Sequence, residues 1–198
     1  QQMPEHDFYF LFDRPFSDEF IFAKNATPIV VAPQARHPLL WYWWFEKSIP
    51  KILKEYKIDL FFSPYAYCSL QTDVPQILTI HDLGFEHFPS HVPFLVRKYY
   101  QFFTPKYCEK AAKILAVSEF TKRDIIERYG IDEKKIEVVY NGFDQETHNI
   151  NQKSRQKLPY FIFIGAVHPR KNVLNLLKAF ELFKQKNNHT TQLILVGR

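Results

Sequence analysis

Short runs of consecutive apolar residues recur along the chain, and each has the length of a β-strand. A run without polar alternation indicates a strand that is buried on both faces. The runs occupy residues 8–12, 28–32, 59–63, 76–80, 113–117, 136–140, 160–164 and 192–196. Between them lie patterns with apolar residues at helical spacing, at about residues 41–56, 94–111, 119–129 and 173–186. This alternation predicts an α/β fold in which helices cover both sides of a parallel sheet.

A strand, a turn and a helix follow one another at residues 160–186. The turn carries Arg170 and Lys171 in succession, shortly after Gly165. Phosphate is commonly held by free N–H groups at a helix N-terminus with cationic side chains beside them. The helix shows a clear apolar face, made of Val173, Leu176, Leu177, Phe180 and Phe183. The segment predicts phosphate binding, and the alternative is an ordinary strand-to-helix connection that happens to carry a lysine.

The composition of the chain changes sharply once. Residues 144–157 are almost wholly polar, and a new apolar strand begins directly after them. We therefore expect a Rossmann-like domain at residues 1–143, a linker at 144–158 and the start of a second Rossmann-like domain at 159–198. The chain also starts and stops abruptly, so we expect it to be a fragment.

The overall composition is typical of a globular protein, because 46% of the 198 residues are hydrophobic. Basic residues are interleaved with acidic ones and leave a formal charge of only +5, which argues against a nucleic-acid partner. Such a mildly basic surface suits anionic small molecules or an anionic membrane face. No apolar run has the length of a membrane span, and no signal peptide is evident. Cys68 and Cys108 are isolated, which suits a reducing cytoplasm and a structural role.

The glycines are too far apart for two common nucleotide-binding motifs. They stand at Gly84, Gly130, Gly142, Gly165 and Gly197. Neither the dinucleotide-binding fingerprint nor the P-loop is present in this chain, because both need closely spaced glycines.

His81 and Asp82 follow the predicted strand at residues 76–80. Ligands of parallel sheets bind at the carboxyl ends of the strands, so this pair is a candidate site. The alternative is a hydrogen-bonded turn in which Asp82 caps nearby backbone groups and His81 only packs.

A zinc site made of His81, Glu86, His87 and His91 is a weaker hypothesis. Pro89 prevents His87 and His91 from sharing one helical face. The spacing does not support a Ser-His-Asp or Cys-His arrangement either.

Ser118 lies between a predicted strand and a predicted helix, where it is a suitable N-cap, and Glu119 then favours the helix dipole. The same hydroxyl and the free N–H groups of the helix are also able to bind a ligand oxygen. The aromatic segment at residues 41–45 is better explained as part of a core than as a platform for sugar or lipid.

Four short segments occur in a fixed order, at residues 79–83, 117–121, 138–144 and 163–172. Together they resemble the motifs of group 1, family 4 retaining glycosyltransferases, over about residues 63–198. The resemblance implies the GT-B fold, in which two Rossmann-like domains face each other across a cleft. The first domain holds mainly the acceptor, and the second holds the nucleotide-sugar donor. The most similar members are bacterial mannosyltransferase-like enzymes that build surface polysaccharide.

The resemblance implies roles for several residues. Arg170 and Lys171, after Gly165, would neutralise the donor diphosphate without a metal ion or other cofactor. His81 would hydrogen-bond a hydroxyl of the donor sugar, and Asp82 would orient that loop or the acceptor. Retention implies attack on the front face, assisted by the leaving phosphate.

Four further residues are expected near the cleft. Ser118 and Thr121 belong to the second of the four segments, and Asn141 and Gly142 belong to the third, where the chain turns into the linker. A hinge at Asn141 and Gly142 would let the two domains close.

The chain departs from the family pattern in three places. Ala166 follows Gly165 where an arginine is usual, so Lys171 is the safer phosphate ligand. The glycine-rich loop of the first domain and the paired glutamates of the second are absent. We therefore expect the fragment alone to be inactive.

The resemblance implies a transferase that moves a hexose, such as mannose from GDP-mannose, to a glycan or lipid-linked acceptor. We expect it in the cytoplasm, at the inner face of the membrane. Two alternatives stay open. One is a GT-B sugar epimerase or phosphorylase, and the other is a binding or scaffold module that has lost donor chemistry.

Overall fold

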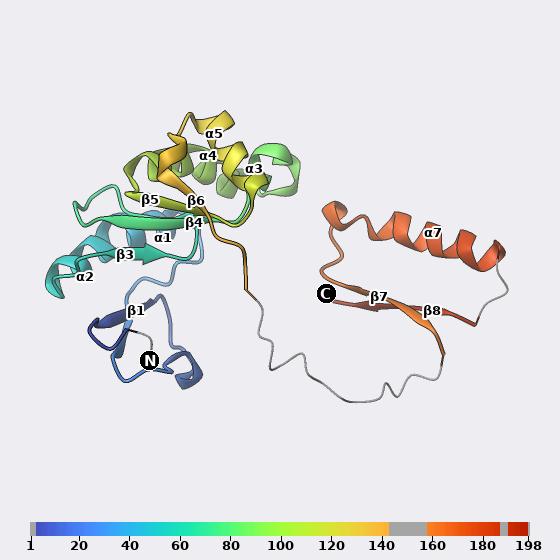
Figure 1. Ribbon diagram of the computed structural model, residues 1–198, viewed down its shortest axis with the longest axis horizontal. Coiled ribbons are helices and arrows are strands. Elements are labelled where there is room, and N and C mark those ends of the chain that lie inside the picture. The colour runs from blue at the N-terminus through green and yellow to red at the C-terminus, as the bar shows by residue number, and fades with distance from the viewer. Residues whose placement is uncertain (1–2, 143–157, 187–189, 198) are drawn as a thin grey trace. The chain divides into compact units, whose positions relative to one another are not determined.

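A computed structural model describes residues 3–142, 158–186 and 190–197 of the chain (Figure 1). The chain forms two compact units, Gln1–Asn141 and Gly142–Arg198, which we name the first unit and the second unit. Nearly all of the linker predicted at residues 144–158 lies outside the described residues, so its extent stays a prediction.

The centre of the first unit is a parallel sheet. Its strands lie in the order β3 (Phe61–Ser63), β4 (Gln76–Ile80), β5 (Lys113–Ala116) and β6 (Ile136–Val138), and each is parallel to its neighbours. Residues along β4 alternate between buried and half-buried, and none of them is exposed. This is the environment that an uninterrupted apolar run predicts. The expected α/β class with a parallel sheet is confirmed.

The first two strands of the chain form a separate sheet. β1 (Phe8–Phe12) and β2 (Ala26–Val30) pair only with each other among the described strands, in parallel. Both ends of β2 lie two residues earlier than predicted. The last bond along it is donated by the N–H of Val31 to the carbonyl oxygen of Phe12. Pro33 has no N–H with which to extend the pairing.

The helix predicted at residues 41–56 is a succession of three elements. They are α1 (Pro38–Trp43), a π-helical turn (Trp44–Ser48) and α2 (Ile49–Glu55). Pro50 lacks the N–H group that an α-helix would donate to the carbonyl oxygen of Glu46, which accounts for the wider turn at this point.

The other long helices of the first unit agree with the predicted ranges to within one residue. They are α4 (Phe94–Lys110) and α5 (Glu119–Tyr129). Shorter elements that the apolar pattern does not reveal lie between the strands: α3 (Gly84–His87) and 3-10 segments at Asp18–Phe20, Pro89–His91 and Glu133–Lys135.

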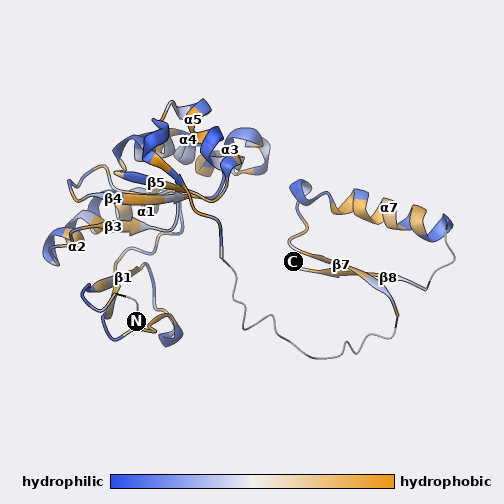
Figure 2. Ribbon diagram, in the orientation of Figure 1, coloured by the Kyte–Doolittle hydropathy of each residue, from blue (hydrophilic) through white to orange (hydrophobic). Residues whose placement is uncertain are grey.

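Two hydrophobic cores stabilise the first unit, and hydrophobic residues concentrate along its strands (Figure 2). The larger core joins strands β4 and β5 to helices α4 and α5, and both cysteines belong to it. Cys68 and Cys108 are fully buried and not disulfide-bonded. Burial raises the pKa of the Cys108 thiol to about 12, so this thiol is inert at neutral pH. The smaller core contains Val31, Trp44, Phe45, Ile49 and Leu53.

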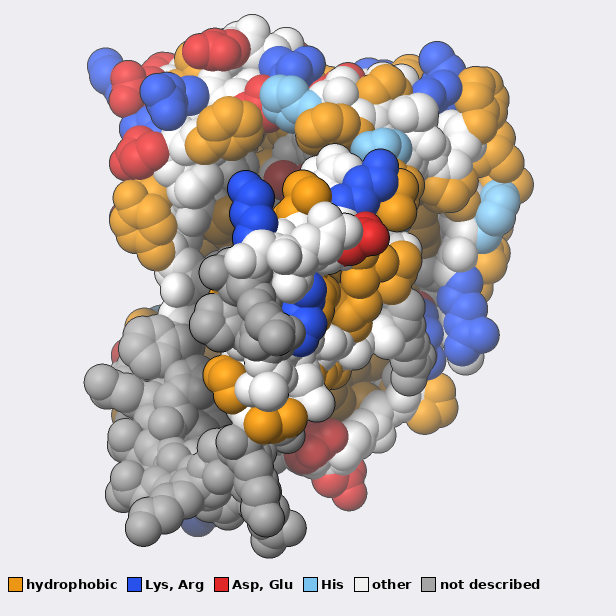
Figure 3. Space-filling view, turned by 90° about the vertical axis from the view of Figure 1, so that its right-hand side faces the viewer, with side chains coloured by type: hydrophobic (Ala, Val, Ile, Leu, Met, Phe, Trp, Pro, Cys, Tyr) orange, Lys and Arg blue, Asp and Glu red, His pale blue; other side chains and the backbone are white. Residues whose placement is uncertain are grey.

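The aromatic segment at residues 41–45 divides between core and surface. Trp44 and Phe45 are buried, and Trp41 stacks on Tyr100. Tyr42 and Trp43 are exposed. The expected core face therefore accounts for only part of this segment. Exposed hydrophobic side chains are also evident on the face of the molecule shown in Figure 3. None of the described helices could span a membrane.

The described part of the second unit is a β-α-β arrangement. Its elements are β7 (Tyr160–Ile164), a 3-10 turn (Pro169–Lys171), α7 (Val173–Lys186) and β8 (Gln192–Val196). The two strands are parallel. The ring of Phe161 on β7 makes edge-to-face contacts with Phe180 and Phe183 on α7. The strands and the helix have the predicted bounds.

Candidate functional site

The predicted site residues of the first unit lie after the carboxyl ends of three adjacent strands. His81 follows β4, Ser118 comes two residues after β5, and Asn141 comes three residues after β6. Since these strands are parallel neighbours, the three positions share one edge of the sheet. Gly142 is next to Asn141, and the rest of that segment lies outside the described residues.

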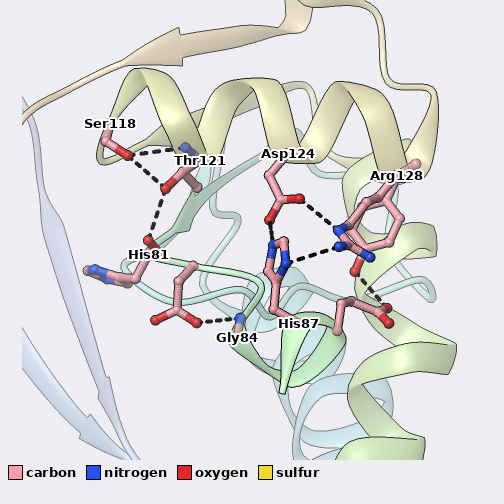
Figure 4. Close-up of polar contacts among 10 residues, drawn as sticks. His81, Gly84, His87, Ser118, Thr121, Asp124 and Arg128 are labelled. Carbon is pink, nitrogen blue, oxygen red and sulfur yellow. Dashed lines mark hydrogen bonds and ion pairs between the residues drawn. The ribbon is translucent and has the colours of Figure 1, made fainter. Parts of the chain in front are cut away.

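Hydrogen bonds join the loop after β4 to the start of α5 (Figure 4). The Oγ of Ser118 accepts a bond of 3.1 Å from the N–H of Thr121, so Ser118 is the N-cap of α5. The hydroxyl of Thr121 lies 2.9 Å from the same oxygen and donates to the carbonyl oxygen of His81, at 3.2 Å. Two predicted motifs that are far apart in sequence are therefore in direct contact.

The imidazole ring of His81, which follows β4, contacts the loop that follows the neighbouring strand β3. Its Nε2 lies 3.0 Å from the carbonyl oxygen of Pro64, which is in the loop after β3. A carbonyl oxygen only accepts, so Nε2 carries the proton in this contact. In the neutral ring Nδ1 is then an acceptor, which suits a hydroxyl donor.

Asp82 shapes the loop that carries His81. Its Oδ1 accepts a bond of 2.7 Å from the N–H of Gly84, the first residue of α3. This is the local capping contact that the sequence offered as the alternative to a ligand role. It fixes the backbone of the loop next to His81.

The side chains of His87, Asp124 and Arg128 form a closed ring of polar contacts next to this loop. The Nε2 of His87 lies 2.6 Å from Oδ2 of Asp124, and the Nε of Arg128 donates to Oδ1 of Asp124 at 2.7 Å. The ring closes through Arg128, whose guanidinium lies 3.1 Å from Nδ1 of His87. Asp124 is buried, and the other two side chains are partly exposed. The ring attaches α3 to α5.

Glu86 makes a second attachment in the same region. It accepts hydrogen bonds from the hydroxyl of Tyr129 on α5 and from the amide of Gln101 on α4, each at 3.2 Å. Burial, followed by the negative charge of Glu86, raises the pKa of Tyr129 above its usual range. The phenol therefore stays protonated and keeps donating at neutral pH.

The zinc hypothesis does not fit these contacts. His81 bonds to Pro64, His87 bonds to Asp124 and Glu86 bonds to Tyr129, so the suggested ligands are directed to different partners. Among the described residues, no three histidine, cysteine or acidic side chains are grouped as metal ligands.

In the second unit, Gly165 directly follows β7, at a point where two backbone segments come very close. Its N–H donates to the carbonyl oxygen of Val196 at 2.8 Å. Its φ is +154°, and a Cβ on Gly197 would collide with the carbonyl oxygen of Gly165. Both positions therefore require glycine. The N–H of Gly165 is used in strand pairing, so Gly165 allows the close approach rather than offering its own N–H to a ligand.

The turn after β7 has the predicted arrangement of strand, cations and helix. Arg170 and Lys171 lie on the 3-10 turn, and both are exposed. The Nδ1 of His168 accepts a bond of 3.3 Å from the N–H of Arg170 and caps the turn. Asn172 then adopts a left-handed conformation with φ of 53°, and α7 begins at the next residue. Helix α7 thus starts two residues after the second of two adjacent cationic side chains.

Comparison with known protein families decides the assignment. Residues 5–147, which include the His81 loop and the start of α5, match the family model described as Glycosyltransferase Family 4. The chain belongs to glycosyltransferase family 4.

Two relatives that match most of this chain are named as O-antigen chain mannosyltransferases. This chain is 26% identical over 185 residues to the O-antigen chain mannosyltransferase RfbU of Salmonella typhimurium. It is 24% identical over 187 residues to the O-antigen chain mannosyltransferase B of Escherichia coli. Each match covers 89% of this chain, but only 49% and 46% of those relatives. The chain thus spans about half the length of these two relatives.

Two further similarities agree with the family. Over 87 residues, 44% of this chain, it is 34% identical to the capsular polysaccharide biosynthesis glycosyltransferase CapH of Staphylococcus aureus, covering 24% of that protein. The crystal structure of a glycosyltransferase from Rickettsia africae matches 99% of this chain, with a TM-score of 0.62 at 17% identity, and 53% of that protein is covered. The expected GT-B type of fold is confirmed.

The sequence motifs contain some of the residues that form this region and lack others. The ring of His87, Asp124 and Arg128 is absent from the predicted site. One signal was available, because Asp124 and Arg128 are four residues apart on one helix, the spacing of an intrahelical ion pair. The partner histidine, 37 residues earlier, has no such local signal.

Proposed function

We propose that this family 4 glycosyltransferase transfers a hexose, with mannose from GDP-mannose as the first candidate, to a glycan or lipid-linked acceptor of surface polysaccharide, with retention. One observation carries the proposal. The His81 loop and the start of α5, which both lie within the part of the chain that matches the family, are hydrogen-bonded to each other at the ligand-binding edge of a parallel sheet. Two of the relatives are named as O-antigen mannosyltransferases, which supports the choice of mannose.

His81 is proposed to position the donor sugar. Its Nδ1 accepts a hydroxyl proton of the sugar while Nε2 stays bonded to Pro64. A ring held at one nitrogen is oriented in advance, which lowers the entropic cost of positioning the anomeric carbon. Asp82 orients this loop or the acceptor. Thr121 on α5 supports the loop through its bond to the carbonyl oxygen of His81, and Ser118, the N-cap of α5, bonds to Thr121.

Arg170 and Lys171 are proposed to stabilise the leaving nucleoside diphosphate, with Lys171 as the main ligand. Both lie on the turn just before α7, and at the start of that helix the first-turn N–H groups and the helix dipole favour an anion. Two cations take the place of a metal ion in neutralising the negative charge that develops on the leaving group. Asn141 and Gly142 are proposed as a hinge between the two domains of the enzyme.

A scaffold without donor chemistry is the second candidate, because Ala166 occupies the position where family members usually carry an arginine. The two candidates differ in turnover. A transferase consumes the nucleotide-sugar and releases nucleoside diphosphate, whereas a scaffold does neither. A GT-B epimerase would change the sugar in the absence of any acceptor.

The test is sugar transfer by the complete gene product, with GDP-mannose and lipid-linked saccharides extracted from membranes. We expect the released GDP to equal the mannose transferred, and NMR to show an axial anomeric bond as in the donor. His81→Ala should abolish transfer, and His6→Ala should leave it unchanged, because His6 is exposed and remote in sequence from the motifs. The 198-residue chain alone should be inactive. No transfer by the complete gene product, or full transfer by His81→Ala, would contradict the proposal.

A further inference from the structure

Large aromatic side chains are exposed along the carboxyl edge of the sheet in the first unit. Tyr65 comes two residues after β3, Phe120 four residues after β5 and Tyr140 two residues after β6. Their exposed fractions are 63%, 61% and 69%. One exposed aromatic residue is ordinary, but three at the edge where parallel sheets bind their ligands indicate a binding surface.

Tyr65 stands beside His81, the residue proposed to position the donor sugar. The centres of the two rings are 5.9 Å apart, and the ring planes are tilted by 43°. Both residues are exposed. The two loops are also joined directly, because Nε2 of His81 bonds to the carbonyl oxygen of Pro64, the residue before Tyr65. An aromatic ring therefore flanks the solvent-exposed space next to the imidazole.

The backbone that carries Tyr65 is fixed by hydrogen bonds. The carbonyl oxygen of Tyr65 accepts a bond of 2.9 Å from the Oγ of Ser63 and a bond of 2.8 Å from the N–H of Tyr67. The ring of Tyr67 in turn stacks on Phe45 of the smaller core, with 4.8 Å between ring centres. A ring presented from a fixed backbone loses little conformational entropy when it binds a ligand.

The chemistry of a tyrosine side chain at this place suits a sugar. One face of a pyranose ring carries mainly C–H groups, which pack favourably on the negative face of an aromatic ring. The phenolic hydroxyl can donate to a sugar hydroxyl and accept from one. A phosphate group would be repelled by the negative ring face, so the diphosphate of the donor is a poor occupant.

The two nitrogens of His81 separate two places for sugars. Under the proposed function Nδ1 accepts a hydroxyl proton of the donor sugar, whereas Nε2 faces the loop after β3. Tyr65 belongs to that loop, so it lies on the Nε2 side of the imidazole. Transfer needs the attacking hydroxyl next to the anomeric carbon of the donor, so the acceptor must lie beside the donor sugar. A sugar stacked on Tyr65 is in the place of the acceptor.

We propose that Tyr65 binds the terminal sugar of the acceptor by stacking, so that the acceptor is recognised through its saccharide rather than through a lipid. This inference rests on the proposed function, because it takes His81 as the residue that holds the donor sugar. It goes further by naming a binding residue for the acceptor and the part of the acceptor that this residue contacts.

Transfer kinetics of the complete gene product test the role of Tyr65 in the reaction. Tyr65→Ala should raise the KM for the lipid-linked saccharide about fivefold, while kcat and the KM for GDP-mannose stay close to those of the wild type. Tyr65→Phe keeps the ring and should restore most of the acceptor affinity. Phe22→Ala is the control, because it removes a ring that is 81% exposed just before β2, and it should have no effect. Circular dichroism confirms that each variant is folded.

Binding without turnover separates this inference from the proposed function. Saturation-transfer NMR of the 198-residue chain with lipid-free mannobiose should give a signal with the wild type and with Tyr65→Phe. The signal should fall about fivefold with Tyr65→Ala. If the complete gene product transfers no sugar, the proposed function fails, and this measurement still decides the sugar contact.

Four results would overturn the inference. The first two are the absence of a mannobiose signal with the wild type and an unchanged signal with Tyr65→Ala. The third is a Tyr65→Ala variant in which the KM rises for GDP-mannose alone, since the ring would then serve the donor. The fourth is a fall in kcat with a rise in both KM values, since the ring would then serve domain closure.

Discussion

Strands β4 and β7 have similar apolar sequences but different surroundings. β4 reads Gln-Ile-Leu-Thr-Ile, and its residues are buried or half-buried. β7 reads Tyr-Phe-Ile-Phe-Ile, which is more apolar, yet four of its five residues are exposed. In the first unit, β4 lies between two strands and shares the larger core with α4 and α5, whereas in the described part of the second unit β7 is accompanied by one strand and one helix. The apolar pattern thus predicts where a strand forms, and the number of neighbouring elements decides how far it is buried.

The difference in burial should translate into a difference in stability. Removing apolar surface from water contributes about 25 cal/mol for each Å². The first unit has two cores with many fully buried side chains, and in the described part of the second unit only Val173 is buried. Stability should therefore reside in the first unit.

The largest expected effect comes from separating the two units. Residues 1–141 expressed alone should unfold cooperatively on heating, because both cores are intact. Residues 142–198 alone should show no cooperative transition, because so short a segment with so little burial cannot offset its conformational entropy. Circular dichroism melting of the two fragments measures this. A cooperative transition of the second fragment on its own would show that the comparison is wrong.

The next effect compares the same substitution in the two units. Ile114 on β5 is fully buried, and Ile162 on β7 is 52% exposed. Ile114→Ala should lower the free energy of unfolding by about 3 kcal/mol through lost burial and a cavity. Ile162→Ala should leave the main urea-induced transition unchanged within about 0.5 kcal/mol. Similar losses in the two variants would contradict the account.

A smaller effect concerns the ring of His87, Asp124 and Arg128. Asp124→Ala removes the carboxylate that both partners share, and we expect a loss of about 2 kcal/mol because Asp124 is buried while its partners are partly exposed. Asp73→Ala is the matched control, since Asp73 is fully exposed and pairs with Lys110 at the surface. Its effect should be below about 0.5 kcal/mol. Urea denaturation measures both.

The smallest effect is the pH dependence due to Glu46, a buried carboxyl group in the first unit. Burial raises its pKa above the usual range, although the N–H of Leu70 and the hydroxyl of Tyr107 donate to it. Because the pKa is raised in the folded state, the contribution of this carboxyl group to stability is fully present at pH values below the ordinary pKa of glutamate. The contribution is lost as the pH rises through the raised pKa. Glu46→Gln cannot ionise, so its stability relative to the wild type should increase between about pH 4 and pH 7. A pH-independent difference would contradict this assignment.

The apolar pattern predicted most elements because burial on both faces leaves a local signal. β4, β7, β8, α5 and α7 have the predicted bounds. The separate pairing of β1 with β2 was not predicted, since strand order depends on contacts between distant segments. The π-helical turn before Pro50 was also missed, although the proline itself was visible.

The candidate site was predictable where strand ends supply the residues. His81 and Ser118 follow parallel neighbours, so the topology alone places them at one edge. The contact between Thr121 and His81 crosses 40 residues, and that between His87 and Asp124 crosses 37. Such contacts have no periodic signature and emerge only from the fold. The roles of Arg170 and Lys171 stay predictions, because the two units are described separately.

Calorimetric titration of the complete gene product with GDP-mannose, UDP-glucose and UDP-N-acetylglucosamine tests the proposed donor site most directly. The matched variants are Lys171→Ala, on the turn just before α7, and Lys178→Ala, at an exposed lysine on α7 itself. The account predicts that one donor binds, that Lys171→Ala loses this binding and that Lys178→Ala keeps it. Binding that survives in Lys171→Ala, or no binding of any of these donors, would contradict it.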